Sequence, residues 1–513
     1  MSGLDPSFTA LPYRSLGDAA LARARELGVS HADFRFERVR YQNLAVRDGV
    51  LQDASDSEDL GFAVRVVHRG SWGFASGVVL TTDEAVRVAE AAVAVAEVAA
   101  AMTSRPVELA AEPVYDDVTW ISAYDLNPLE VPVADKAAVL IDWTERLRAG
   151  AAVDHASAFL AQVQENKYYA DLAGTRTTQQ RVRMMPGFEA MGAGADTFDS
   201  MASIAPPVGR GWEYVAGDAA QGAWDWDAEL AEVPELLAEK LKAPSVEAGT
   251  YDLVIHPSNL WLTIHESIGH ATELDRALGY EANYAGTSFA TTDQLGVLQY
   301  GSAVMNVTGD RTIPHGLATI GYDDEGVKTQ EWDIVDDGVL VGYQLDRPMG
   351  VMLPELNPGP DGAGRSNGCA YADSPGHIPI QRMANVSLQP DPSPDAPSTD
   401  DLIGRVERGL YVVGDKSWSI DMQRFNFQFT GQRFYAIKDG ELSGQVRDVA
   451  YQATTTEFWN SMEAVGSRDT WVLGGAFNCG KAQPGQVAAV SHGCPTSLFR
   501  DIRILNTLEE GGQ

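Results

Sequence analysis

Cysteine and histidine are both scarce in this chain, which has three cysteines and nine histidines among 513 residues. Three cysteines cannot build a disulfide framework, so a reducing cytoplasm is the expected compartment. In such a compartment a cysteine that matters is more often a metal ligand or a nucleophile than half of a bridge. The few histidines also make a closely spaced histidine pair unlikely to arise by chance.

Positive charge is lacking as well. The chain carries 38 basic and 72 acidic residues, a formal net charge of −34. Binding to the phosphates of nucleic acid needs a basic surface, so nucleic acid is not an expected partner. We assign the acidity to a well-solvated surface.

Long apolar runs are absent too. The N-terminal stretch 1–28 has no apolar segment of the kind found in secretory signals, so we expect no export. The most apolar long stretch, residues 85–102, is rich in alanine and is interrupted by Arg87, Glu90 and Glu97. These features predict a packed helix of a soluble protein and no membrane segment.

The length predicts two domains, residues 1–245 and 246–513, because one hydrophobic core rarely serves so long a chain. In the first, a helix over 17–28 precedes extended segments that turn at Asp48-Gly49 and near Arg69-Gly70. A helix then begins after Thr81, which has capping-box spacing to Glu84. This order predicts an α+β domain with an antiparallel sheet and packed helices.

The second domain is expected to be mostly β, with one important helix near its start. A short strand is predicted over 251–256, followed by the helix, with Ser258 as its cap. Asp-Gly pairs within 335–344 and 437–446 predict two hairpins. We therefore expect this helix to pack against β structure on its apolar side.

The helix contains the sequence HESIGH, with His265, Glu266 and His270. Metallopeptidases commonly carry two histidines four residues apart, which places the side chains about 40° apart around a helix; five residues leave them about 140° apart. A regular helix therefore could not bring both imidazoles to one zinc ion. Either a π-bulge or a loosening of the helix at Gly269 would restore convergence, so we predict a distortion between Glu266 and His270.

Catalytic zinc usually takes three protein ligands, so a third is expected elsewhere. Cys479, on a glycine-rich turn, is one candidate, and a buried structural cysteine is the competing interpretation. Cys369 and Cys494 are weaker rivals, the latter with His492 two residues before it. Glu273 and Asp275 follow the motif but are expected to point along the exit of the helix.

Five sequence blocks resemble the TldD side of the TldD/TldE (PmbA) metallopeptidase family in order and spacing. They are LTIHESIGHATELD, YAGTSFA, GYDDEG, GRSNGCAYADSPGHIPIQRMANV and NCGKAQPGQ, between residues 262 and 486. One stretch, residues 414–441, lacks the glycine-rich sequence typical of the family. This departure concerns substrate preference rather than the metal site.

The resemblance implies Zn²⁺ ligands at His265, His270 and Cys479, with Glu266 as the catalytic carboxylate. It implies a peptidase for short or unfolded polypeptides, which are held as an added strand inside a dimer. A TldE/PmbA-type partner subunit is the usual arrangement in the family, and a homodimer is the alternative. A non-catalytic scaffold subunit and a zinc amidase acting on modified peptides are the competing functions.

The group that stabilises the developing negative charge is not identified by any motif. His315, His377, Tyr322 and Tyr371 are candidates by residue type alone, and each also suits a structural role.

Overall fold

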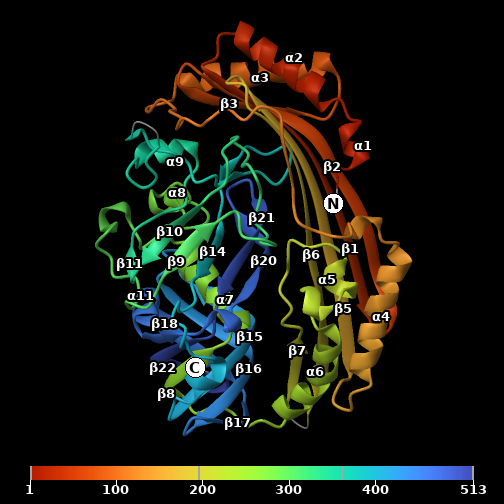
Figure 1. The fold of residues 1–513 in the computed structure, drawn as a ribbon, viewed down its shortest axis with the longest axis vertical. Helices are drawn as coiled ribbons and strands as arrows, with labels where there is room; N and C mark the ends of the chain where they lie inside the picture. Colours follow the sequence, from red (N-terminus) through yellow and green to blue (C-terminus); the bar gives the residue numbers. More distant parts are fainter. Residues whose placement is uncertain (1–2, 195–196, 360–361, 511–513) are drawn as a thin grey trace.

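The computed structural model describes residues 3–194, 197–359 and 362–510, which fold into two lobes (Figure 1). A long curved sheet forms the N-terminal lobe, and the C-terminal lobe lies against its concave side. Helices and largely antiparallel sheets occur in both lobes, so the predicted α+β class is confirmed.

The sheet of the N-terminal lobe has seven strands in the order β3-β2-β1-β5-β6-β4, with β7 beside β6. Their bounds are β1 (His31–Arg47), β2 (Val50–His68), β3 (Ser71–Gly77), β4 (Val118–Ile121), β5 (His155–Asp171), β6 (Arg176–Ala193) and β7 (Phe198–Ala202). Asp48 and Gly49 adopt φ of +52° and +79°, as the tight turn between β1 and β2 requires. Arg69 and Gly70 do the same between β2 and β3, so both predicted turns are confirmed.

Helices cover two ends of this sheet and give it two hydrophobic cores (Figure 1). The bounds are α1 (Pro6–Thr9), α2 (Tyr13–Glu26), α3 (Thr82–Ala100), α4 (Val133–Arg148), α5 (Glu213–Ala216) and α6 (Trp226–Lys240). Thr81 caps α3 as predicted, its hydroxyl accepting from the Glu84 amide at 3.3 Å. None of the helices in the described part of the chain has the length and apolar character needed to cross a membrane.

Alanine is abundant in α3 because this helix lies unusually close to the sheet. A Cβ atom at Gly73 of β3 would collide with the carbonyl of Ala92 in α3. Small residues on both sides therefore permit the approach, and Ala85, Ala89 and Ala92 are fully buried in the interface.

The C-terminal lobe is built on a closed ring of strands. The order β15-β8-β22-β18-β16 is completed by pairing of β16 with β15. The strands are β8 (Gly249–Ile255), β15 (Arg408–Ile420), β16 (Asn426–Lys438), β18 (Val449–Thr454) and β22 (Ser497–Asn506), with β17 (Glu441–Val446) and β19 (Met462–Val465) at its margins. Strands from both ends of the domain therefore become neighbours, because β8 pairs with both β15 and β22.

Smaller sheets and short helices complete this lobe. They are β9 (Val307–Asp310), β10 (Glu331–Asp336), β11 (Val339–Leu340), β12 (Ala370–Tyr371), β13 (Ile380–Gln381), β14 (Asn385–Leu388), β20 (Val472–Lys481), β21 (Gln486–Cys494), α8 (Leu274–Ala277), α9 (Arg347–Met352), α10 (Thr399–Ile403), α11 (Thr455–Asn460) and α12 (Thr507–Glu510). The predicted hairpins β10–β11 and β16–β17 are confirmed, with both Asp-Gly pairs at positive φ.

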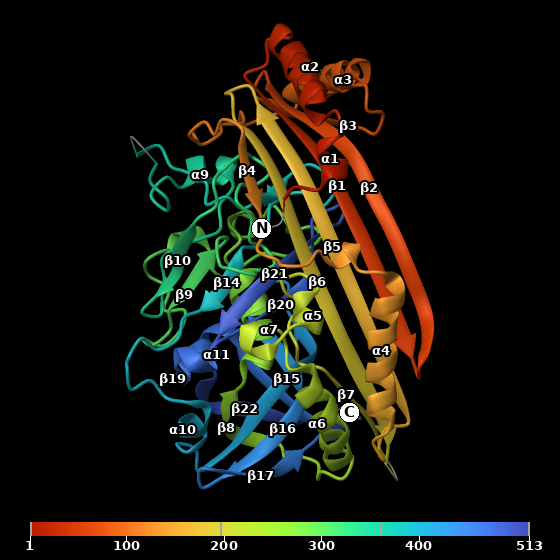
Figure 2. The same cartoon turned by 45° about the vertical axis from the view of Figure 1, so that its right-hand side comes forward.

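Helix α7 (Pro257–Ile264) packs between the ring of strands and the β20–β21 hairpin, as Figure 2 shows. Leu260 and Ile264 are fully buried. The predicted cap was wrong by two residues: His256 is the N-cap, and its Nδ1 accepts from the Ser258 amide at 3.2 Å. Ser258 instead accepts from the Gly414 amide at 2.9 Å, which ties α7 to β15.

Buried ion pairs join the two lobes. Lys167 of β5 lies 2.9 Å from Glu37, 3.0 Å from Glu165 and 2.7 Å from Asp324 of the C-terminal lobe. All four side chains are at most 4% exposed. Removing one charge from such a cluster leaves another unpaired in a dry environment, which typically destabilises a protein by about 3–5 kcal/mol. The cluster therefore fixes the concave face of the sheet against the C-terminal lobe.

Candidate metal centre

The α-helix that carries the motif becomes a π-helix at His265–Gly269. The His270 amide donates to the His265 carbonyl at 3.0 Å, a bond that spans five residues. The extra residue is thereby absorbed, and the two imidazole rings lie with centroids 4.7 Å apart. The predicted distortion between Glu266 and His270 is confirmed, and it is a π-bulge rather than a break.

The π-turn requires a small residue at position 269, which is Gly269. A Cβ atom there would lie 2.5 Å from the sulfur of the buried Met383. Glycine therefore allows the π-turn to lie flush against the chain just before β14, which keeps His270 directed toward the hairpin.

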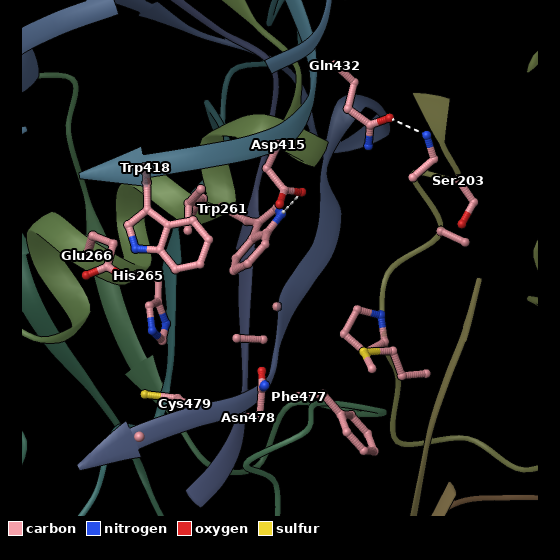
Figure 3. A pocket seen from close by; sticks show the side chains of 18 of the residues that line it. Ser203, Trp261, His265, Glu266, Asp415, Trp418, Gln432, Phe477, Asn478 and Cys479 are labelled. Atoms are coloured by element: carbon pink, nitrogen blue, oxygen red, sulfur yellow. Dashed lines mark hydrogen bonds between the residues drawn. The ribbon is translucent and has the colours of Figure 1, made fainter. Parts of the chain in front are cut away.

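Cys479 approaches from β20. Its Sγ lies 3.5 Å from His270 Nε2, and one ligand atom each from His265, His270 and Cys479 all lie within 4.8 Å of one another. The register of β20 against β21 shifts between Ala476 and Cys479, an irregularity that re-aims side chains beside functional sites. Figure 3 shows His265 and Cys479 pointing toward one another.

The other two cysteines lie elsewhere. Burial raises the pKa of Cys369 to about 12 and raises that of Cys494 further, so both behave as inert buried thiols. Burial also acts to raise the pKa of Cys479, but His270 and Arg382 outweigh it and lower the pKa below its usual value. Among the three cysteines, only Cys479 has a pKa that its surroundings lower.

His492 determines which nitrogen of His265 is free. The Val386 carbonyl can only accept, so His492 Nδ1 donates to it at 2.8 Å. His492 Nε2 then accepts from His265 Nδ1 at 2.7 Å, which leaves a lone pair on His265 Nε2. Burial lowers the pKa of both imidazoles, which favours their neutral forms. The sequence had placed His492 beside Cys494 and gave no indication of this contact.

Glu273 has the same role for the second histidine. His270 Nδ1 lies 3.0 Å from Glu273 Oε2, so Nε2 keeps its lone pair toward Cys479. Burial acts to raise the pKa of Glu273, but Lys481, His270 and Arg276 outweigh it and hold the pKa well below its usual value. A carboxylate behind a ligating imidazole is a common arrangement in zinc sites.

These donors fit a zinc ion. Two imidazole lone pairs and one cysteine sulfur converge, each of the three residues is 5% exposed, and both histidines have fixed tautomers. Three protein ligands leave a fourth position open, which is typical of catalytic rather than structural zinc.

Glu266 lies on the π-turn between the two histidines and faces the same space. Its Oε2 lies 2.5 Å from Nη1 of Arg424, which is in the turn between β15 and β16. Arg424 lies in the stretch that departs from the family's glycine-rich pattern, but the sequence did not indicate that it would meet Glu266.

A cleft of 650 Å³ opens in front of these residues and is walled by both lobes. Aromatic and other apolar side chains contribute much of its lining: Phe159, Met185 and Phe188 from the N-terminal sheet, and Trp261, Trp418 and Phe477, labelled in Figure 3, from the C-terminal lobe. The candidates His315, His377, Tyr322 and Tyr371 do not line this cleft. His377, for example, pairs with Asp373, and Tyr371 lies under Lys167.

Residues 248–506 match the family described as PmbA/TldA metallopeptidase C-terminal domain, and residues 32–96 match PmbA/TldA metallopeptidase domain 1. A metalloprotease of Methanothermobacter thermautotrophicus is 27% identical over 93% of this chain and 96% of its own. A zinc metalloprotease TldD homolog of Saccharolobus solfataricus is 21% identical over 94% and 98%.

Solved structures share the fold. A putative modulator of DNA gyrase from Thermotoga maritima superposes with a TM-score of 0.74 at 15% identity, covering 96% of this chain and 100% of its own. TldE from Thermococcus kodakarensis gives 0.67 at 15% identity, covering 95% and 99%.

Proposed function

The chain belongs to the TldD/PmbA metallopeptidase family, and we propose that it is a zinc-dependent peptidase acting on short or unfolded polypeptides. The observation that carries the proposal is the convergence of His265, His270 and Cys479 in a cleft that also holds the Glu266 carboxylate. The three side chains would hold the ion, and Glu266 would move protons.

A zinc ion in this place supplies a Lewis acid that acidifies water and polarises a carbonyl group. Glu266 accepts a proton from the attacking water and later donates it to the leaving amine. His492 and Glu273 hold the two imidazoles in fixed tautomers and orientations, and burial lowers the pKa of both rings, which favours their neutral forms. The ligand residues and Glu266 are each 5% exposed, so few water molecules reach them, which strengthens these polar interactions.

Strand β20 offers a way to bind an extended peptide. Six consecutive residues, Gly475–Gly480, line the cleft, so an edge of the strand as well as a face is exposed to it. An extended peptide can pair with such an edge through main-chain hydrogen bonds, which impose few demands on its sequence. Folded proteins offer no free strand, which supports a preference for unfolded chains.

A second subunit would complete the enclosure of the cleft. We propose a TldE/PmbA-type partner, which is supported by the fold shared with a solved TldE; a homodimer is the alternative. Chromatography of the chain alone and mixed with such a subunit distinguishes the two.

The proposal is tested by metal analysis and by cleavage of an unstructured peptide, with and without the partner subunit. Glu266→Ala should keep its zinc but lose about 10²–10⁴-fold in cleavage rate, because proton transfer would lack its carrier. Glu441→Ala, which removes an exposed carboxylate on β17, should leave both unchanged. A Glu266→Ala variant that cleaves like the wild type would contradict the mechanism, and a metal-free wild type would favour a scaffold role.

A further inference from the structure

We propose that Arg424 is a catalytic residue: its guanidinium stabilises the negative charge that develops on the substrate carbonyl oxygen. This inference rests on the proposed peptidase function. Its basis is the position of Arg424 opposite Glu266, where the side chain lines the cleft.

Arg424 is the fixed cation of the site. Among the described residues that line the cleft, no other lysine or arginine occurs. The histidines there are the proposed ligands, and Asp415 is acidic and accepts from Trp261 at 3.2 Å. Besides Trp261, the neutral side-chain donors that line the cleft are those of Ser203, Trp418, Gln432 and Asn478. Of these only Asn478 adjoins a proposed ligand, Cys479, in the sequence.

The turn that carries Arg424 is rigid. The Asp421 carboxylate accepts from the amides of Gln423, Phe425 and Asn426 at 2.8–3.1 Å. The Thr455 hydroxyl donates to the Arg424 carbonyl at 2.7 Å. Reorientation of the side chain therefore does not require the backbone to move.

Arg424 also has a backbone conformation that suits glycine better. Its φ is +62°, in the left-handed region that residues with a Cβ atom seldom adopt. Strained conformations of this kind cluster at functional sites, where the side chain has a role that outweighs the strain. A glycine would fit the turn, so arginine at this position needs an explanation from its guanidinium.

The Arg424 guanidinium has N–H groups beyond the one that pairs with Glu266. Nη1 pairs with Glu266, and Nη2 lies 3.4 Å from the Ala285 carbonyl. Nε is buried and has no hydrogen-bond partner among the described residues. The side chain lines the cleft and is 15% exposed, so a group bound in the cleft can reach the Nη donors that these contacts leave free.

The proton transfer to Glu266 explains how the cation becomes available. As the water oxygen bonds to the carbonyl carbon, one water proton moves to Glu266 and the carbonyl electron pair moves onto its oxygen. Glu266 is then neutral, so Arg424 loses its ion-pair partner at the moment when the new negative charge appears. When the C–N bond breaks, Glu266 gives its proton to the amine nitrogen and the ion pair forms again.

The test uses Arg424→Gly, which removes the cation and relieves the backbone, beside Lys416→Met, which removes an exposed cation on β15 outside the cleft. Arg424→Gly should keep its zinc and melt cooperatively, because relief of the left-handed backbone offsets part of the lost ion pair with Glu266. Its kcat should fall by about 10²–10³-fold, with KM changed much less, as for loss of an oxyanion donor. Lys416→Met should behave like the wild type.

Binding supplies a second measurement. A phosphinic peptide mimics the tetrahedral anion, and its affinity for Arg424→Gly should fall in parallel with kcat. Added guanidinium at millimolar concentration should restore part of the activity of Arg424→Gly but none in Asn478→Ala. The same loss of phosphinate affinity in Asn478→Ala, with none in Arg424→Gly, would assign the role to Asn478.

These measurements distinguish a failure of the role proposed for Arg424 from a failure of the proposed peptidase function. A zinc-loaded, active wild type with an equally active Arg424→Gly would overturn only the role of Arg424. Loss of kcat with unchanged phosphinate affinity would reduce Arg424 to a positioning residue for Glu266. A wild type without zinc and without cleavage would overturn the peptidase as well.

Discussion

Replacing His492 with leucine tests whether this residue fixes the tautomer of His265. Leucine fills much of the same space but cannot accept the 2.7 Å hydrogen bond from His265 Nδ1. Both residues are buried, with His492 at 0% exposure, so water does not readily take its place. The proton of His265 is then free to move to Nε2, where it would block the lone pair that faces His270 and Cys479.

Two estimates of the effect agree. An unsatisfied buried donor is unfavourable by about 1–3 kcal/mol. Loss of a residue that orients a metal ligand typically lowers metal affinity by about 10–100-fold, or ~1.4–2.7 kcal/mol. We therefore expect the zinc dissociation constant of His492→Leu to rise by about 10–100-fold.

The assay is competition for zinc with a chromophoric chelator, with the melting temperature of the zinc-free protein checked alongside. His492→Gln should stay within about threefold of the wild type, because its amide oxygen can accept the same bond. Wild-type affinity in His492→Leu, or equal losses in both variants with intact folding, would refute the assignment.

Three further predictions concern the surroundings of the site. Cys479→Ser should weaken zinc binding in chelator competition, whereas Cys494→Ser should not; the reverse result would move the third ligand. Gly269→Ala should lower the free energy of unfolding, measured in urea, by about 1 kcal/mol, because the new Cβ atom meets the buried Met383. Part of this loss should vanish in a Met383→Ala background. An unchanged free energy of unfolding would show that the π-turn tolerates a larger residue. Burial raises the pKa of Asp415 to about 6, so the contribution of this residue to the free energy of unfolding falls as the pH rises from about 4 to 6. Asp415→Asn should lack this fall in urea titrations at several pH values. A variant with the same pH profile as the wild type would contradict the shifted pKa.

Local features of the fold were predictable because their physics is local. The Asp-Gly pairs specify tight turns through their tolerance of positive φ, and Thr81 caps α3 through a contact three residues away. The cap of α7 was misassigned because His256 competes with Ser258 for the same role, and propensity alone favours serine. The predicted domain boundary near 245 remains a prediction.

Only part of the candidate site could be predicted from the sequence. The spacing of His265 and His270 required a distortion, since a regular helix would separate them, and the π-bulge supplies it. Cys479 was one of three candidate cysteines until the resemblance singled it out, because pairing across 209 residues depends on how β20 meets the helix. No periodicity encodes such a contact.

The roles of Arg424 and His492 could not be predicted from the sequence, for the same reason. Arg424 is one of 38 basic residues, and nothing in the sequence shows that the turn that carries it lies beside Glu266, 158 positions earlier. His492 acts through His265, 227 positions earlier, across the β20–β21 hairpin. Both contacts depend on tertiary packing, of the β15–β16 turn in the first case and of β21 against the helix that carries the motif in the second.

The most direct test of the metal centre is the zinc content of the purified protein. Elemental analysis should find about one zinc ion per chain in the wild type and none in a folded double variant, His265→Ala with His270→Ala. A wild type without zinc, or a double variant that retains it, would contradict the assignment of this cleft as a metal centre.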